Sequence, residues 1–176
     1  LLTELCDSLQ FMTTERALYL RREGPPSLII EGDAMKTRRI AQNLLLNALK
    51  YTTDGGVTVT WGDSRDNDPQ RWMLTVRDTG PGFHAGPGAP LAAALQEATN
   101  EARELDSRAG ESSSTMSADV HDVRPVRQQR GEGIGLSIVK RLCELLDASL
   151  ELESAPGEGT TFRVVFPRRY PPAAPH

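Results

Sequence analysis

The sequence predicts an α+β fold, a two-layer α/β sandwich in which helices cover one face of a mixed, mostly antiparallel sheet. Two observations support this prediction. Several segments carry apolar residues at the spacing of amphipathic helices, and the segments between them have the short, alternating pattern of half-buried strands. With 176 residues, the chain is long enough for one such domain with its own core and a long insertion.

The N-terminal part of the chain predicts two helices with two short strands between them. Apolar residues recur at helical spacing in residues 2–12. Strand-like runs follow at 17–21 and 27–30, and Gly-Pro-Pro at 24–26 forces a turn between them. The second helix is predicted at 33–51, because an aspartate stands at its start as a helix cap and its leucines form an apolar face.

Four further strands and one helix complete the predicted sandwich. Residues 57–61 and 72–76 have strand character and are joined by a polar loop. Residues 136–146 have helical periodicity. Residues 150–153 and 162–166 alternate like two strands, and the Pro- and Gly-containing segment between them predicts a hairpin.

The segment 83–130 does not fit this regular pattern. It is rich in Gly, Ala, Pro and Ser, and its one regular stretch, 91–105, predicts an exposed or loosely docked helix. An excursion of this length inside a compact domain is typical of a functional lid or of disorder. We therefore expect a domain at 1–167 that contains a long lid at 83–130, followed by a flexible, proline-rich tail at 168–176.

Composition excludes some classes of function. Lys and Arg number 20 against 24 Asp and Glu, a net charge of −4, which argues against a nucleic-acid binder. No apolar run approaches the roughly 18 residues of a membrane span, so we expect no membrane contact by this chain. Cys6 and Cys143 lie among apolar helix formers and predict buried thiols in a reducing, cytoplasmic setting. The chain begins without methionine, which suggests a piece of a longer protein whose membrane anchor, if present, lies upstream.

The first candidate motif lies on the second predicted helix, in the run NLLLNALKYT. Asn43, Asn47, Lys50 and Tyr51 are spaced at i, i+4, i+7 and i+8, so they share one helix face. Amide oxygens suit a hard cation such as Mg²⁺, an ammonium suits phosphate oxygens, and a tyrosine ring can pack against a nucleoside. Taken alone, the motif also fits a solvated helix face.

The second candidate motif is Asp78-Thr79-Gly80-Pro81-Gly82, directly after a predicted strand. Glycines there let the backbone approach a ligand, and a carboxylate at a strand end can accept a hydrogen bond from an exocyclic amine such as that of adenine. Asp-x-Gly is also a common turn, so this motif alone does not decide between a turn and a site.

The third candidate motif opens the helix near residue 136 with Gly131, Gly133 and Gly135. A glycine-rich turn at a helix N-terminus offers free N–H groups and the positive end of the helix dipole to phosphate. A dinucleotide-binding turn has similar spacing. Here, however, Arg-Gln-Gln-Arg at 127–130 precedes the glycines, so the strand that a Rossmann unit needs is missing.

In this order, the three motifs resemble the ATP-binding domain of histidine kinases, within the superfamily that also contains gyrase, Hsp90 and MutL. The resemblance covers about residues 33–167 and implies a Bergerat-type ATP-binding fold with ATP and Mg²⁺ as ligands. It implies that Asn43 and Asn47 hold Mg²⁺ and that Lys50 contacts phosphate, the three residues expected to act in catalysis. The residues that the resemblance places around the nucleotide are Asn47, Lys50, Tyr51, Asp78, Gly80, Gly82, Arg130, Gly131, Gly133, Ile134, Gly135, Leu136 and Thr160.

Two of these assignments carry further detail. Asp78 is expected to read the adenine amine, whereas Thr160, taken as the last pocket residue of the family, also fits the start of a hairpin strand.

In the gyrase, Hsp90 and MutL branch, a glutamate general base stands one helical turn before the metal-binding asparagine. Asn43 occupies that place here, and an amide cannot accept the proton of an attacking water.

We therefore expect the catalytic domain of a two-component sensor histidine kinase. It would phosphorylate a histidine on a separate dimerisation domain of the same protein, and that phosphoryl group would pass to a response regulator. The alternative is a nucleotide-dependent regulatory module without phosphotransfer. A water-activating ATPase is disfavoured by Asn43.

The sequence departs from the family pattern in its lid. His121, followed by Asp122, looks like the start of a phosphoacceptor box, but Pro125 and the missing apolar periodicity predict an ordinary lid histidine. No phenylalanine motif is apparent beyond Phe83. The arginines that could reach the β- or γ-phosphate, or could simply be solvated, are Arg124, Arg127 and Arg130.

Overall fold

A computed structural model describes residues 1–65, 68–82 and 132–170, and only the backbone of 132–134. The helices are α1 (Leu2–Glu15), α2 (Ala34–Tyr51) and α4 (Glu132–Leu145). The strands are β1 (Tyr19–Glu23), β2 (Gly56–Asp63), β3 (Arg71–Asp78), β4 (Ser149–Ala155) and β5 (Gly159–Pro167).

The strands form one five-stranded sheet in the order β1-β2-β3-β5-β4. Strand β1 runs parallel to β2, and all other neighbours are antiparallel. The register of β3 and β5 places Asp78 opposite Thr160, although the two residues are distant in sequence. The predicted mixed, mostly antiparallel sheet is therefore confirmed.

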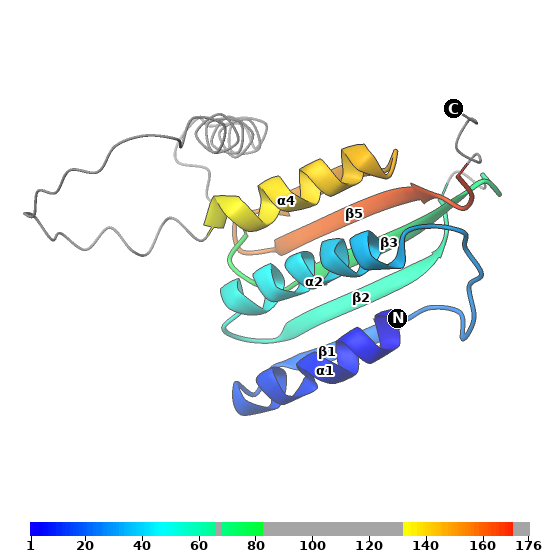
Figure 1. Cartoon of the computed structure of the whole chain (residues 1–176). Coiled ribbons are helices and arrows are strands. Elements are labelled where there is room, and N and C mark those ends of the chain that lie inside the picture. The colour runs from blue at the N-terminus through cyan, green and yellow to red at the C-terminus, as the bar shows by residue number, and fades with distance from the viewer. Residues whose placement is uncertain (66–67, 83–131, 171–176) are drawn as a thin grey trace, which may run out of the picture. The chain divides into compact units, whose positions relative to one another are not determined.

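The helices lie on one face of this sheet, as Figure 1 shows for α1, α2 and the part of α4 from Ile138 onward. Alternate strand residues, such as Val59 and Leu74, point into the helix layer and are fully buried. The leucines and Ile40 of α2 cover them from the other side. Burial of this interface drives the formation of the two layers, and the predicted sandwich is confirmed.

Both ends of α2 are capped. Asp33 precedes the helix, and its carboxylate accepts a hydrogen bond from the Lys36 backbone N–H at 2.9 Å, as its cap position predicts. At the other end, the guanidinium of Arg16, just after α1, donates to the carbonyl oxygens of Leu49 and Thr52, the second at 2.8 Å. A cation bonded to the last carbonyls of a helix also complements the helix dipole.

The prediction of strands at 17–21 and 27–30 was partly wrong. The first strand begins later, at Tyr19, because α1 continues to Glu15 and Ala17 adopts a positive φ of 55° in the turn that follows. Residues 27–30 form no strand. Leu28 and Ile30 line a cavity with Trp61 of β2 and Trp72 of β3, whereas the Ile29 side chain is exposed. The apolar run therefore belongs to a loop at the cavity and not to a strand.

The tail also begins later than predicted. Arg168 accepts a hydrogen bond from the Glu31 backbone N–H at 2.8 Å, and its guanidinium pairs with Asp63. The Tyr170 hydroxyl donates to the Leu146 carbonyl at 2.7 Å. Residues 168–170 are therefore docked on the domain, and the expectation of a free tail from Arg168 was wrong for them. Residues 171–176 lie outside the described residues.

Several other expectations also concern residues that the structure does not describe. They are the 91–105 helix, His121, Arg124, Arg127, Arg130 and Gly131. In the described ranges, Cys6 and Cys143 are buried and free, as predicted, and burial raises the pKa of Cys143 to about 12. None of the described helices is both long and apolar enough to span a bilayer.

Candidate functional site

The site is organised around Asp78, the last residue of β3. Its side chain is 6% exposed, because it follows Val76 on the face of the sheet that the helices cover. Carboxylate Oδ1 accepts the Gly80 backbone N–H at 2.9 Å and the Thr160 backbone N–H at 3.2 Å. Burial raises the pKa of Asp78, and the two N–H groups oppose that rise.

The two backbone N–H groups therefore fix the direction of the Asp78 carboxylate. Among the described residues, both hydrogen bonds to it are accepted by Oδ1. The second oxygen, Oδ2, remains the atom that can accept a hydrogen bond from a ligand amine. A carboxylate held in this way suits recognition of one donor in a fixed position.

Gly82 brings the loop after β3 against the hairpin between β4 and β5. Its φ is +77°, and a Cβ at this position would lie 2.3 Å from the Ala155 carbonyl oxygen. Next to it, the Pro81 carbonyl accepts the Gly157 N–H at 2.9 Å. Only glycine fits this close approach, so the glycine in the motif has a structural reason in addition to the predicted ligand contact.

Thr160 is buried and lies at the start of β5, opposite Asp78. Its hydroxyl lies 3.0 Å from that of Ser154, its cross-strand partner on β4. Ser154 also donates to the Gly159 carbonyl at 3.2 Å. Sequence reasoning missed Ser154, although a hydroxyl residue opposite a candidate pocket threonine in a predicted hairpin was the available signal.

The polar stripe of α2 is present but not uniform. Asn43 donates from Nδ2 to the Arg39 carbonyl at 2.7 Å, which leaves its amide oxygen as an acceptor. Asn47, one turn later, is half-buried. The Lys50 side chain is exposed, and its Nζ lies 5.4 Å from the centre of the Tyr51 ring, a cation–π distance.

The first two motifs share a cavity of about 430 Å³. Tyr51, at the end of α2, lines it, as do Thr79, Gly80 and Pro81 after β3. Gly157 contributes the hairpin between β4 and β5. Asn47, Lys50, Asp78 and Gly82 are not among its lining residues. The cavity therefore joins the end of the helix motif to the loop after β3, and it includes neither the whole stripe nor the aspartate itself.

The sequence predicted the third motif as a glycine-rich turn before a helix at 136–146, but the described part of the motif lies inside the helix. Helix α4 begins at Glu132, so Gly133, Ile134, Gly135 and Leu136 all fall within its first turns. Helix N-termini present unpaired N–H groups, which is the property on which the phosphate prediction depends.

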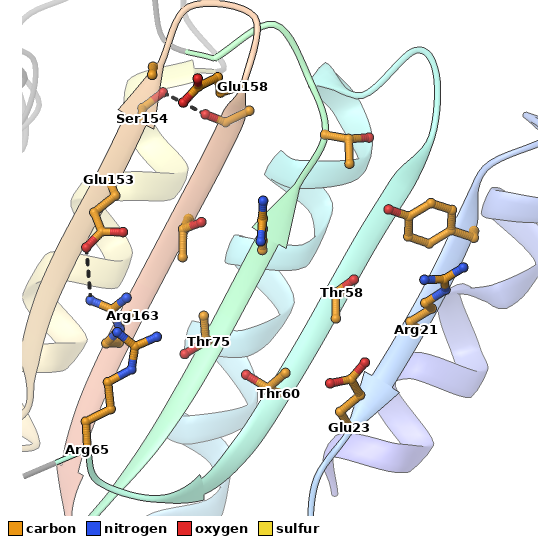
Figure 2. Close-up of a pocket in the computed structure, with 16 residues that line it drawn as sticks. Arg21, Glu23, Thr58, Thr60, Arg65, Thr75, Glu153, Ser154, Glu158 and Arg163 are labelled. Atoms are coloured by element: carbon orange, nitrogen blue, oxygen red, sulfur yellow. Dashed lines mark hydrogen bonds and ion pairs between the residues drawn. The ribbon is translucent and has the colours of Figure 1, made fainter.

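A separate cavity, of about 1050 Å³, lies on the opposite face of the sheet. Figure 2 shows Thr58, Thr60 and Thr75 along its centre, with Arg163 beside them. Arg163 is bonded to Glu151 at 2.7 Å and is therefore neutralised. None of the described helices covers this face, which agrees with its polar side chains, and Asp78 points away from it.

The donor set of α2 fits Mg²⁺. Asn43 and Asn47 offer two amide oxygens one helical turn apart, and Mg²⁺ prefers a few protein oxygens together with phosphate and water. No group of three or more His, Cys, Asp or Glu side chains among the described residues forms a metal site. A cation held by two amides and a nucleotide needs no such group.

Comparison with known proteins decides the family. Residues 32–170 match the family of histidine kinase-, DNA gyrase B- and HSP90-like ATPases. The chain belongs to this family. The expected histidine kinase-like ATP-binding domain is thereby confirmed, and the Asp78 loop and the α2 motif fall inside the matched range.

Relatives of this ATPase-family chain include sensor proteins of bacteria. It is 33% identical over 162 residues to the sensor histidine kinase TmoS of Ectopseudomonas mendocina, covering 91% of this chain and 14% of TmoS. It is 28% identical over 170 residues to the sensor protein EvgS of Escherichia coli strain K12, covering 95% of this chain and 12% of EvgS. The chain thus spans a small fraction of the length of these relatives.

Solved structures agree on the fold. The mycobacterial sensor histidine kinase MprB has a TM-score of 0.60 at 25% identity, covering 95% of this chain and 94% of that one. Full-length ShkA, solved with AMPPNP, has a TM-score of 0.66 at 24% identity, covering 94% of this chain and 29% of ShkA. The catalytic domain of ThkA has a TM-score of 0.63 at 15% identity, covering 96% of this chain and 91% of that one.

Proposed function

We propose that this chain is the ATP-binding catalytic domain of a two-component sensor histidine kinase. It holds Mg-ATP and presents the γ-phosphate to a histidine on the dimerisation domain of the same protein, from which a response regulator receives it. The observation that carries the proposal is the buried Asp78 carboxylate, oriented by Gly80 and Thr160 N–H groups in a chain of the histidine kinase-like ATPase family.

Asp78 selects adenine. Its Oδ2 accepts one hydrogen from the exocyclic amine, which a guanine base lacks at that position. Because Gly80 and Gly82 have no side chains, the base can approach the backbone of this loop. Tyr51, at the end of α2, borders the nucleoside. Thr160 closes the pocket beside Asp78.

The phosphates are held by the other two motifs. Asn43 and Asn47 would hold Mg²⁺ through their amide oxygens, and the cation would supply positive charge that offsets the charge of the phosphates. Lys50 donates to a phosphate oxygen from its exposed ammonium. We assign the phosphate contacts to the chain around the start of α4, at Arg130, Gly131, Gly133, Ile134, Gly135 and Leu136, where the N–H groups of the first helical turn have no intrahelical partner.

Asn43 directs the reaction toward transfer and away from hydrolysis. An amide does not act as a general base, so no group at this position activates water. The histidine nitrogen instead attacks the γ-phosphorus in line, the bond to the β,γ-bridging oxygen breaks, and ADP leaves. Positioning and electrostatic stabilisation supply most of the rate enhancement in such transfers.

The domain organisation is part of the proposal. We place the ATP-binding domain at 1–167 with the docked residues 168–170 added, and the lid at 83–130. A cytoplasmic location accompanies this function, and the two free cysteines suit a reducing compartment.

Calorimetry with Mg-ADP tests the nucleotide site. We expect the wild-type chain to bind, and Asp78→Asn to bind roughly 10- to 100-fold more weakly, because an amide N–H replaces the acceptor that faces the adenine amine. Asp63→Asn is the matched control, because Asp63 pairs with Arg168 away from the candidate pocket. Absence of wild-type binding, or equal binding by Asp78→Asn, contradicts the proposal.

Phosphotransfer needs a second assay. The chain is fused to a phosphoacceptor helix pair and incubated with ATP labelled in the γ-phosphate. We expect acid-labile, alkali-stable label on the histidine and little free phosphate. Nucleotide binding without any histidine label would identify a binding module, and rapid phosphate release would identify an ATPase.

A further inference from the structure

Thr79, the residue between Asp78 and Gly80, has a hydroxyl group that bonds to a different part of the chain. Its Oγ1 accepts the Gly56 backbone N–H at 2.9 Å. The same hydroxyl lies 2.9 Å from the Asp54 carbonyl oxygen, to which it donates, and 3.3 Å from the Gly56 carbonyl. The hydroxyl thus uses its one donor hydrogen and one of its two acceptor lone pairs within one turn.

That turn is the segment that leaves α2. Helix α2 ends at Tyr51, and β2 begins at Gly56, so Asp54 lies midway between them. The β2–β3 ladder ends with the pair Val57 and Asp78, and the Thr79 N–H continues it by donating to the Gly56 carbonyl at 3.1 Å. The Thr79 side chain therefore fastens the end of α2 to the end of β3.

This fastening acts where the two candidate motifs meet. A Cβ at Gly80 would lie 3.2 Å from the Tyr51 carbonyl oxygen, so the helix end and the aspartate loop are in close contact. Gly80 also donates to the Asp78 carboxylate. A shift of the turn relative to Thr79 would therefore move the loop that orients Asp78.

Core packing does not account for Thr79. The residue is exposed, and its hydroxyl is the part that bonds the turn. Replacing the hydroxyl by a methyl group leaves the Gly56 N–H without its partner but keeps the shape of the side chain. Any effect of that replacement on ligand binding thus reports on the hydrogen bonds.

We propose that Thr79 is a positioning residue for adenine recognition, which holds the Asp78 loop in place against the end of α2 through its hydroxyl. The inference rests on the proposed function, because it assigns the Asp78 carboxylate to the adenine amine. It adds a residue at the edge of the candidate cavity whose hydroxyl bonds the turn after α2 and which acts on adenine recognition through Asp78.

A binding cycle tests the proposal. Dissociation constants are measured for Mg-ADP and for the Mg-diphosphate of purine riboside, which lacks the exocyclic amine, with wild type, Thr79→Val and Thr79→Ser. We expect Thr79→Val to weaken ADP binding roughly 10-fold and to leave binding of the amine-free analogue within about 2-fold. Thr79→Ser keeps the hydroxyl, so it retains wild-type affinity for both ligands.

Two further measurements separate positioning from general stability. Thr58→Val removes a threonine hydroxyl from the open face of the sheet, and we expect it to change neither affinity. Amide hydrogen exchange at Gly56 reports the hydrogen bond directly, and we expect faster exchange in Thr79→Val than in Thr79→Ser. If Thr79→Val does not fold, Thr79→Ala replaces it in the same cycle.

The outcomes are distinct. Equal weakening of both ligands by the hydroxyl-free variant, or no weakening of either, overturns the positioning role while leaving the nucleotide site in place. Loss of ADP binding in Thr79→Ser as well overturns it too, because the hydroxyl would then not be the cause. Absence of ADP binding by the wild type removes the proposed function, and this inference with it.

Discussion

The backbone N–H of Thr160 donates to Asp78 Oδ1 at 3.2 Å, across 82 residues of sequence. The contact exists because β3 and β5 are antiparallel neighbours whose register ends with this pair. Gly80 donates to the same oxygen from the loop that follows. Strand pairing and the following loop thus fix Oδ1, and the proposed function assigns the other oxygen, Oδ2, to the ligand.

The cost of burying Asp78 predicts a stability effect that depends on pH. Because its pKa is raised above the ordinary value of 3.8, its contribution to stability is fully present below that value and is lost as the pH rises through the folded pKa. Asp78→Asn removes this charge and can still accept both backbone N–H groups. We expect the stability of the variant relative to wild type to increase as the pH rises from about 4 through the raised pKa of Asp78, measured by urea unfolding. A constant difference across this range would contradict the assignment.

The proposed role of Asn47 predicts that ADP binding depends on Mg²⁺. If its amide oxygen binds the cation, Asn47→Ala should weaken Mg-ADP binding roughly 10-fold, because one of the few protein ligands is lost. A chelator should then weaken ADP binding to wild type but change little in the variant. Gln42→Ala, an exposed amide on the same helix, is the control and should behave like wild type. Equal sensitivity to the chelator in both proteins would argue against Asn47 as a ligand.

Gly159 and Gly157 form a matched pair for a steric prediction. Both have positive φ, at 88° and 78°, but a Cβ at Gly159 would lie 2.1 Å from the Asp78 backbone oxygen, whereas nothing lies within 4 Å at Gly157. Gly157→Ala should therefore destabilise the fold by about 1–2 kcal/mol through backbone strain alone. Gly159→Ala should destabilise it by more and also weaken ADP binding, because β5 must move away from Asp78. Similar unfolding midpoints for the two variants would disprove this.

The sequence was sufficient for the elements and motifs that depend on local pattern. The apolar face of α2, its aspartate cap and the alternation in β2 and β3 all follow from neighbouring residues. Asp78 could be singled out because it directly follows a strand and precedes two glycines. What the sequence could not supply was the partner of its carboxylate, since Thr160 becomes a neighbour only through the strand order.

The errors have the same physical origin. Leu28 and Ile30 line a cavity beside Trp61 and Trp72, and a single sequence does not distinguish such a loop from an edge strand. Arg168 and Tyr170 were assigned to a free tail on composition, but their partners are remote in sequence: Asp63 ends β2, and Leu146 directly follows α4. Contacts of this kind are fixed by tertiary structure and leave no periodic signal.

Substitution of Arg16 tests how much such a remote contact contributes to the free energy of unfolding. Its guanidinium bonds the Leu49 and Thr52 carbonyls at the end of α2, which would otherwise lack partners. Arg16→Ala should therefore lower the free energy of unfolding by about 1–2 kcal/mol, measured by urea denaturation. Arg22→Ala is the control, because its exposed pair with Asp7 should contribute less than about 1 kcal/mol. The same end of α2 carries Tyr51, so Arg16→Ala should also weaken ADP binding, and equal effects of the two substitutions would show that the helix end does not depend on this cap.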